Sequence, residues 1–196
     1  MNRRDAVHAL GASLGSLPFF TRISLAEARE AVAAIQSGTT RIPMTLTAQQ
    51  DALVTRLAEI IIPATDTPGA REARVNEFID LILTEWYDED ERSQFLRGLE
   101  DVDRRSQAAH QVNFLDGTPE QQTQIVAALD GELMERVAAS RTDETKSPDD
   151  LFFYQMKGLT LTGYYTSEIG MTEELQYVAI PGAFRGCAPI SRRSAG

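Results

Sequence analysis

Residues that could perform acid–base or nucleophilic chemistry are scattered along this sequence and do not form a set. The two histidines, His8 and His110, lie far apart in the chain and suit no dedicated metal site. Ser/His/Asp catalysis would depend on His110, which falls at the polar end of a helical pattern and is better interpreted as solvated. The acidic runs at 88–91 and 143–144 fall at helix ends or in loops, where carboxylates cap helices and maintain solubility. The sequence therefore predicts no catalytic residue and no metal site in this chain.

Sequence motifs for the common cofactors are also missing. There is no G-x-G-x-x-G motif for a dinucleotide and no P-loop lysine motif. A C-x-x-C-H haem motif needs two cysteines, and this chain has one, Cys187. We therefore expect no cofactor in this chain. Cys187 itself has three interpretations: a small buried hydrophobic residue or, in an exported protein, half of an intermolecular disulfide or a reactive thiol.

The stretch at 60–70 gathers prolines, a glycine and short polar side chains after an apolar run. Pro63 ends the preceding helix, because proline has no N–H to donate and disfavours a helical residue before it. Asp66 and its threonine neighbours can accept backbone N–H bonds in a turn. Pro68-Gly69 then predicts a tight turn with Gly69 at a positive φ. One carboxylate with no basic or second acidic residue close to it in the sequence is a poor basis for catalysis, so we interpret this stretch as a rigid corner between two helices.

Amphipathic patterns on both sides of this corner predict the elements that position it. A capping box from Thr47 to Gln50 opens a helix at 48–62, and a second helix is expected at about 71–87, with Trp86 on its apolar face. Asp88 begins a third helix, which runs to about 107.

Two further helices follow. Thr118 and Pro119 open the fourth, which carries an apolar face through 125–137. The fifth, at about 149–166, is apolar around most of its circumference and is expected to be central, although Gly158 and Gly163 could let another backbone approach it. No alternating strand pattern appears before 177–180, so the sequence predicts an all-α compact bundle of about five helices with a non-helical C-terminal tail.

Composition and charge limit the kind of partner. The chain has 196 residues, 42% hydrophobic and 24% charged, which suits one globular domain. Its net charge of −10 argues against nucleic acid, because phosphate binding needs a basic face.

The first residues form a pattern of their own. Arg3 and Arg4 precede a charge-poor stretch at 6–20, and Ala26-Glu27-Ala28 is a small-x-small triplet of the kind that a signal peptidase cuts. We interpret 1–28 as a twin-arginine signal peptide, the alternative being an ordinary amphipathic helix that stays on the protein. The remaining chain divides into a linker at 29–46, a helical domain at 47–190 and a disordered tail at 191–196.

The tail at 180–190 combines prolines and glycines with two apolar anchors, Phe184 and Ile190. It cannot form a core of its own, and it is too apolar to remain in solvent. It must therefore lie along a surface, either its own domain's or a partner's.

Four separated stretches carry a family resemblance. They are the corner at 61–70, the triplet Phe78-Ile79-Asp80, the helical segment at 159–170, and the tail with Pro181-Gly182 and Gly186-Cys187-Ala188-Pro189. In this order they resemble the gluconate 2-dehydrogenase subunit 3 family, the small subunits of bacterial flavin-dependent sugar and polyol dehydrogenases. The resemblance covers about 46–190.

This resemblance implies a non-catalytic small subunit in a periplasmic complex. Its partner would be a large FAD-containing subunit of the glucose–methanol–choline type, with a multihaem cytochrome c as a further subunit that holds the assembly at the membrane. The small subunit would stabilise the flavoprotein in the manner of a chaperone and carry the export signal. The residues expected at the partner interface are Pro63, Asp66, Pro68, Gly69, Tyr164, Tyr165, Pro181, Phe184, Cys187 and Pro189. The alternative function is a free-standing periplasmic helical domain that binds a ligand or acts as an enzyme.

Overall fold

The computed structural model describes residues 44–141, 143, 147–178, 180 and 182, which belong to one compact unit. Within these residues the secondary structure is helical and contains no strand, so the all-α prediction is confirmed. The elements are α3 (Ala48–Ile61), α4 (Val75–Glu85), α5 (Glu89–His110), the 3₁₀ turn η1 (Phe114–Asp116), α6 (Pro119–Ser140), α7 (Phe152–Thr166) and the π-helical turn η3 (Gly170–Glu174).

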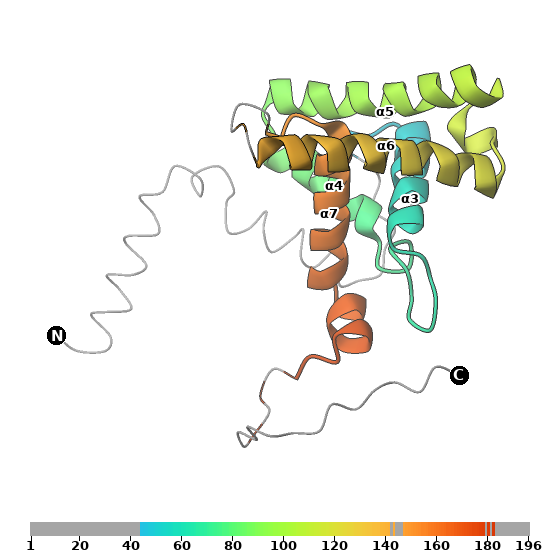
Figure 1. Cartoon of the computed structure of the whole chain (residues 1–196). Coiled ribbons are helices and arrows are strands. Elements are labelled where there is room, and N and C mark those ends of the chain that lie inside the picture. The colour runs from blue at the N-terminus through green and yellow to red at the C-terminus, as the bar shows by residue number, and fades with distance from the viewer. Residues whose placement is uncertain (1–43, 142, 144–146, 179, 181, 183–196) are drawn as a thin grey trace. The chain divides into compact units, whose positions relative to one another are not determined.

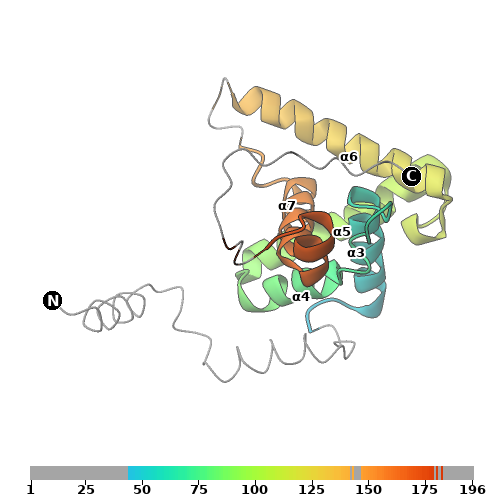
Figure 2. The same ribbon diagram turned by 90° about the horizontal axis from the view of Figure 1, so that it is seen from below.

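Two long helices and three shorter ones enclose the core. In Figure 1, α5 and α6 lie side by side and are joined through η1, while α3 and α7 run across them. Helix α4 packs against both α3 and α7, and Figure 2 shows these three helices from below. The largest fully buried side chains come from every helix of this bundle except α6, and they are Tyr164, Phe95, Phe114, Leu57, Ile79, Leu83, Leu99, Met156, Val54, Val75, Val102 and Thr160.

The helix starts predicted from capping residues are confirmed. Thr47 and Gln50 form a reciprocal capping box at α3, and Thr118 and Gln121 form one at α6. A third box, between Asp88 and Glu91, opens α5. A cap depends only on residues three apart in sequence, so the chain specifies it locally.

The predicted second helix is too long at both ends. Arg74 adopts a left-handed conformation with φ of 54°, and the N–H of Val75 donates to the carbonyl of Ala70 at 3.1 Å, so residues 71–74 form a turn. Helix α4 therefore begins at Val75 and ends at Glu85. Trp86 follows the helix and is 42% exposed, so its predicted place on the apolar face is wrong.

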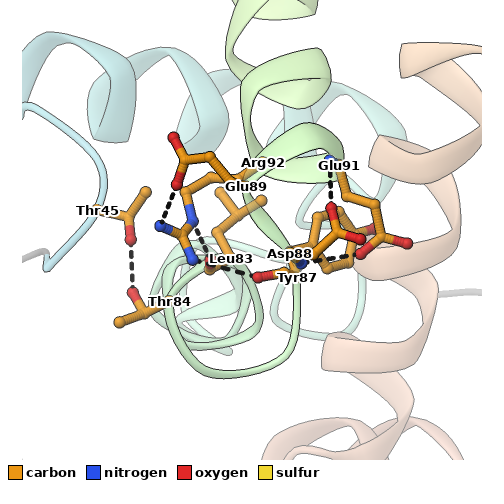
Figure 3. A network of polar contacts seen from close by, with 8 residues as sticks. All are labelled: Thr45, Leu83, Thr84, Tyr87, Asp88, Glu89, Glu91 and Arg92. Atoms are coloured by element: carbon orange, nitrogen blue, oxygen red, sulfur yellow. Dashed lines mark hydrogen bonds and ion pairs between the residues drawn. The ribbon is translucent and has the colours of Figure 1, made fainter.

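The end of α4 is held by the next helix. Arg92 of α5 donates from Nε to the carbonyl of Leu83 at 2.8 Å and from a terminal nitrogen to the carbonyl of Tyr87 at 3.2 Å (Figure 3). A cation near the last carbonyls of a helix satisfies orphan acceptors and interacts favourably with the helix dipole. Thr45 and Thr84 share a hydrogen bond of 2.7 Å nearby, which ties the residues before α3 to the same helix.

The predicted central position of α7 is correct for one side of the helix only. Thr160 and Gly163 are buried, and a Cβ on Gly163 would lie 2.7 Å from the Phe78 ring, so this glycine admits a side chain of α4 and not a backbone. On the other side, Tyr154 and Leu161 are 42% and 40% exposed. The apolar residues of α7 therefore serve both the core and the surface.

Candidate functional site

The predicted corner between α3 and α4 is closed by its own backbone. The N–H of Ala70 donates to the carbonyl of Ile62 at 2.9 Å, across the whole loop. The carboxylate of Glu59 accepts the N–H groups of Ala64 at 3.3 Å and Arg71 at 3.1 Å, one on each side of the loop. These bonds satisfy backbone groups that a loop of this kind would otherwise leave to water, and they hold its two ends together.

Gly69 is required at this corner for a reason that differs from the prediction. The predicted positive φ is wrong, because Gly182 is the glycine of the described chain with a positive φ, at 74°. A Cβ on Gly69 would instead lie 2.5 Å from the nitrogen of Ala64 and 2.9 Å from the oxygen of Ile62. Backbone packs so closely against Gly69 that no side chain fits.

The inner side of the corner binds the end of α7. Tyr164 is only 2% exposed, and its hydroxyl donates to the carbonyl of Pro68 at 2.7 Å. The hydroxyl of Thr67 donates to the carboxylate of Glu174 in η3 at 2.7 Å. The corner therefore fixes both the last turn of α7 and the turn that follows it.

The electrostatics of Tyr164 follow from this position. Burial raises the pKa of Tyr164 above its ordinary value, the hydroxyl of Thr67 acts in the opposite direction, and the carboxylate of Glu174 adds to the rise. The tyrosine is consequently a neutral hydrogen-bond donor at physiological pH. Its ring also meets that of Tyr165 edge to face, with centroids 5.2 Å apart.

Asp80 fixes the chain at the beginning of the domain. This carboxylate is 1% exposed and accepts three backbone N–H groups, from Met44 at 2.7 Å, Thr45 at 3.0 Å and Leu46 at 2.9 Å. Three such bonds satisfy a buried carboxylate without a cation. The residues at the end of the predicted 29–46 linker are thus bound to α4.

Three of the four stretches that carry the family resemblance meet in this region. The corner binds Tyr164 of the 159–170 segment, and Phe78 of the second stretch packs against Gly163 of the same segment. Their shared feature is structural, since each contact sets the position of α7 and of the chain that follows it.

The residues predicted at a partner interface fall into three groups. Pro63 and Asp66 are exposed on the outer side of the corner, Pro68 is half-buried, and Tyr165 is 40% exposed. Gly69 and Tyr164 are buried inside the subunit, where the corner and α7 cover them, and their place at an interface stays a prediction. The other predicted interface residues lie outside the described residues, and they are Pro181, Phe184, Cys187 and Pro189. The predicted export residues Arg3 and Arg4 lie outside them as well.

The most exposed apolar surface was not predicted as such. Tyr154, Gly158, Leu161 and Tyr165 follow one another at spacings of four, three and four along α7 and are all exposed, and we call them the α7 stripe. Beyond η3, further apolar side chains are 55% to 86% exposed, and they are Leu175, Tyr177, Val178 and Ile180. The spacing of the stripe is visible in the sequence. It could not be separated there from the buried face, because apolar residues occur on all sides of α7.

The described residues also set limits on other kinds of site. They contain no group of three or more His, Cys, Asp or Glu side chains that could hold a metal ion. None of the helices among them is both long enough and apolar enough to cross a membrane.

Comparison with known proteins identifies the family. No curated protein and no solved structure matched the chain. The family model described as gluconate 2-dehydrogenase subunit 3 matches residues 48–182, which include α3 through η3 and the corner between α3 and α4. Because this match covers more than half of the chain, the chain belongs to the gluconate 2-dehydrogenase subunit 3 family.

Proposed function

We propose that this chain is a non-catalytic, exported subunit that binds and stabilises the large FAD-containing subunit of a sugar or alcohol dehydrogenase. Membership of a family named for a dehydrogenase subunit supports a role within a complex. The observation that carries the proposal is the exposed α7 stripe, because a subunit with a permanent partner leaves apolar surface uncovered when it is alone.

The composition of the stripe suits a protein interface. Tyr154 and Tyr165 are 42% and 40% exposed, and tyrosine is enriched at interfaces because its ring is apolar and its hydroxyl can still donate a hydrogen bond. Gly158 lies between them, and nothing within 4 Å would meet a Cβ there, so the backbone of α7 is accessible to a partner. Leu161, at 40% exposure, continues the same face.

The corner contributes by positioning this surface. Tyr164, bonded to Pro68, neighbours Tyr165 of the stripe, and Glu174, bonded to Thr67, immediately precedes the exposed Leu175. A fixed end of α7 reduces the conformational entropy that a partner would otherwise have to restrict on binding. The exposed Pro63 and Asp66 complete a partner-facing rim in this proposal.

The remaining parts of the proposal rest on sequence and family resemblance. Arg3 and Arg4 direct twin-arginine export of the folded pair to the periplasm, and a multihaem cytochrome c holds the complex at the membrane. FAD is bound by the large subunit. Pro181, Phe184 and Pro189 lie against that subunit, where Cys187 forms an intersubunit disulfide. Non-reducing electrophoresis of thiol-blocked native complex tests this bond, and two separate subunit bands would exclude it.

The test of the proposed function is co-expression of the full chain with the large flavoprotein subunit of the dehydrogenase from the same source. We expect a stable heterodimer by size-exclusion chromatography with light scattering, with flavin absorbance in the heterodimer peak and none in the isolated small subunit. Replacing the stripe residues Leu161→Glu and Tyr165→Glu should abolish the heterodimer, because two carboxylates would be buried without partners.

A matched control distinguishes the effect of added negative charge from the effect of its location on the α7 stripe. Met134→Glu with Ala138→Glu adds the same charge to exposed residues of α6, outside the stripe, and should leave the heterodimer intact. Absence of a heterodimer with the unmodified chain would overturn the proposed function. A heterodimer that tolerates both pairs of substitutions would instead show that the partner binds elsewhere.

A further inference from the structure

A second surface, separate from the α7 stripe, has a different chemistry. A groove of about 670 Å³ runs between α3, the η1 turn and the start of α6. It is lined by Ala52, Thr55, Arg56, Arg71, Leu115, Gly117, Pro119 and Gln122. Two guanidinium groups therefore line it together with apolar side chains, and the lining includes no carboxylate.

This composition is unusual for such an acidic chain. The sequence holds 29 Asp and Glu residues against 19 Lys and Arg. Two other grooves of the described surface each have at least one carboxylate in their lining, Glu100 and Asp103 in one and Glu120 in the other. A groove with two cations and no acid attracts negatively charged groups that the rest of the surface repels.

Most cations of the described chain are already engaged in ion pairs, and these are Arg74, Arg92, Arg104, Arg105, Arg136 and Lys157. Within the described residues neither Arg56 nor Arg71 forms one. The carboxylate of Glu59 accepts the backbone N–H groups of Ala64 and Arg71 and forms no ion pair with either guanidinium group. The positive charges of both guanidinium groups are therefore available to pair with an anionic group that binds in the groove.

The groove is also pre-organised. Gln122 is 6% exposed and accepts a hydrogen bond from Nε of Arg56 at 2.6 Å. Its own amide nitrogen donates to the carbonyl of Phe114 at 2.9 Å, so the side chain is held at both ends. Arg56 consequently needs little further ordering to bind a ligand, which lowers the entropic cost of association.

We infer that this groove between α3 and α6 binds an acidic segment of a partner polypeptide, with carboxylates on Arg56 and Arg71 and an apolar side chain against Leu115. Carboxylates match the donor geometry of guanidinium groups. Leu115 is 36% exposed and provides the apolar part of the surface. Nucleic acid is disfavoured, because a chain of net charge −10 repels an extended phosphate backbone. This inference does not depend on the proposed function.

Selection from a displayed library of random seven-residue peptides tests the inference with the full chain as the target. We expect the selected peptides to be enriched in Asp and Glu beside a Leu or another apolar residue. The best peptide should bind at least tenfold more weakly to Arg56→Gln/Arg71→Gln than to the unmodified chain, and added salt should weaken its binding. Arg97→Gln/Arg141→Gln removes the same charge from outside the groove lining and should bind normally.

An NMR signal from Arg56 distinguishes peptide binding in the groove from non-specific electrostatic attraction to the protein. The Nε–H of Arg56 is hydrogen-bonded to buried Gln122, so its NMR resonance should be observable and should shift when the peptide is added. The same peptide with Gln and Asn in place of Glu and Asp should cause no shift. If the double variant fails to fold, Arg71→Gln alone serves, because the hydrogen bonds of Arg71 within the described residues involve its backbone. Failure to select any peptide, no acidic enrichment, or equal binding by the groove variant and its control would overturn the inference.

Discussion

Gly69 and Gly131 show how differently two glycines of one chain constrain the fold. Backbone atoms of residues 62–64 lie within 3 Å of the position that a Cβ on Gly69 would take, whereas nothing lies within 4 Å of that position at Gly131 on α6. Gly69 is required by close packing, whereas Gly131 lies in an exposed part of a helix and lowers the stability of that helix.

Gly69→Ala should therefore lower the free energy of unfolding by about 1–3 kcal/mol, because the added methyl group must displace backbone. Gly131→Ala is the control and should raise that free energy by about 0.5–1 kcal/mol through its higher helix propensity. Urea unfolding followed by circular dichroism measures both. An unchanged midpoint for Gly69→Ala would contradict the close approach in the corner.

Tyr164 makes stability depend on pH in the alkaline range. Its folded-state pKa is raised, mainly by burial, so the unfolded chain releases the phenolic proton first. The stabilisation is complete below the unfolded pKa of about 10 and is lost as pH rises towards the folded value. We expect the free energy of unfolding to fall above about pH 10, and to fall less steeply in Tyr164→Phe.

The pKa of Tyr87 is raised as well, first by burial and then by the carboxylate of Glu91, so a residual slope should remain in that variant. Urea unfolding at a series of alkaline pH values measures the slopes. Identical slopes for Tyr164→Phe and the unmodified chain would show that Tyr164 ionises in the folded state as readily as in the unfolded one.

At the scale of helices, the junction between α4 and α5 depends on Arg92. Arg92→Ala removes the donors to the carbonyls of Leu83 and Tyr87 and should lower the free energy of unfolding by about 1–2 kcal/mol. Arg97, five residues further along α5, donates to the hydroxyl of Ser93 and is exposed. Arg97→Ala should therefore change stability by less than about 0.5 kcal/mol. If thermal unfolding shows that both substitutions lower stability equally, the bonds from Arg92 to the end of α4 have no specific stabilising role.

The attachment of residues 44–46 to α4 depends on Asp80. Asp80→Asn offers one acceptor oxygen where the carboxylate offers two, so at least one of three backbone N–H groups loses its partner. We expect a loss of about 1–3 kcal/mol and faster amide hydrogen exchange at 44–46.

Asp103→Asn is the matched control, because Asp103 accepts the backbone N–H of Phe114 through a single oxygen. The asparagine oxygen can keep that bond, so stability should hardly change. Unaltered exchange at 44–46 in Asp80→Asn would show that other contacts hold this segment.

At the scale of the whole molecule, the proposed export depends on a pair of charged residues in the proposed signal peptide. Arg3→Lys/Arg4→Lys should retain the complex in the cytoplasm, because a twin-arginine signal depends on both guanidinium groups. Dehydrogenase activity in fractionated cells measures the distribution. Arg192→Lys/Arg193→Lys, at the other end of the chain, is the control and should leave export unchanged. Normal periplasmic activity of the leader variant would exclude the signal.

The sequence by itself determined the local features of this protein. Thr47, Asp88 and Thr118 predicted three helix starts that the structure confirms, because a capping box is complete within four consecutive residues. Apolar periodicity predicted the helical class, and ordered motifs identified the family. The periodic pattern did not predict the left-handed conformation of Arg74, which delays the start of α4.

The tertiary structure decided what depends on neighbours distant in sequence. The carbonyl of Pro68 and the hydroxyl of Tyr164 are 96 residues apart, and no local pattern predicts that they bond. The apolar residues around α7 likewise give no indication in the sequence of which ones reach the core. Burial is a property of the packed bundle, and only packing distinguishes the buried Tyr164 from the exposed Tyr165 beside it.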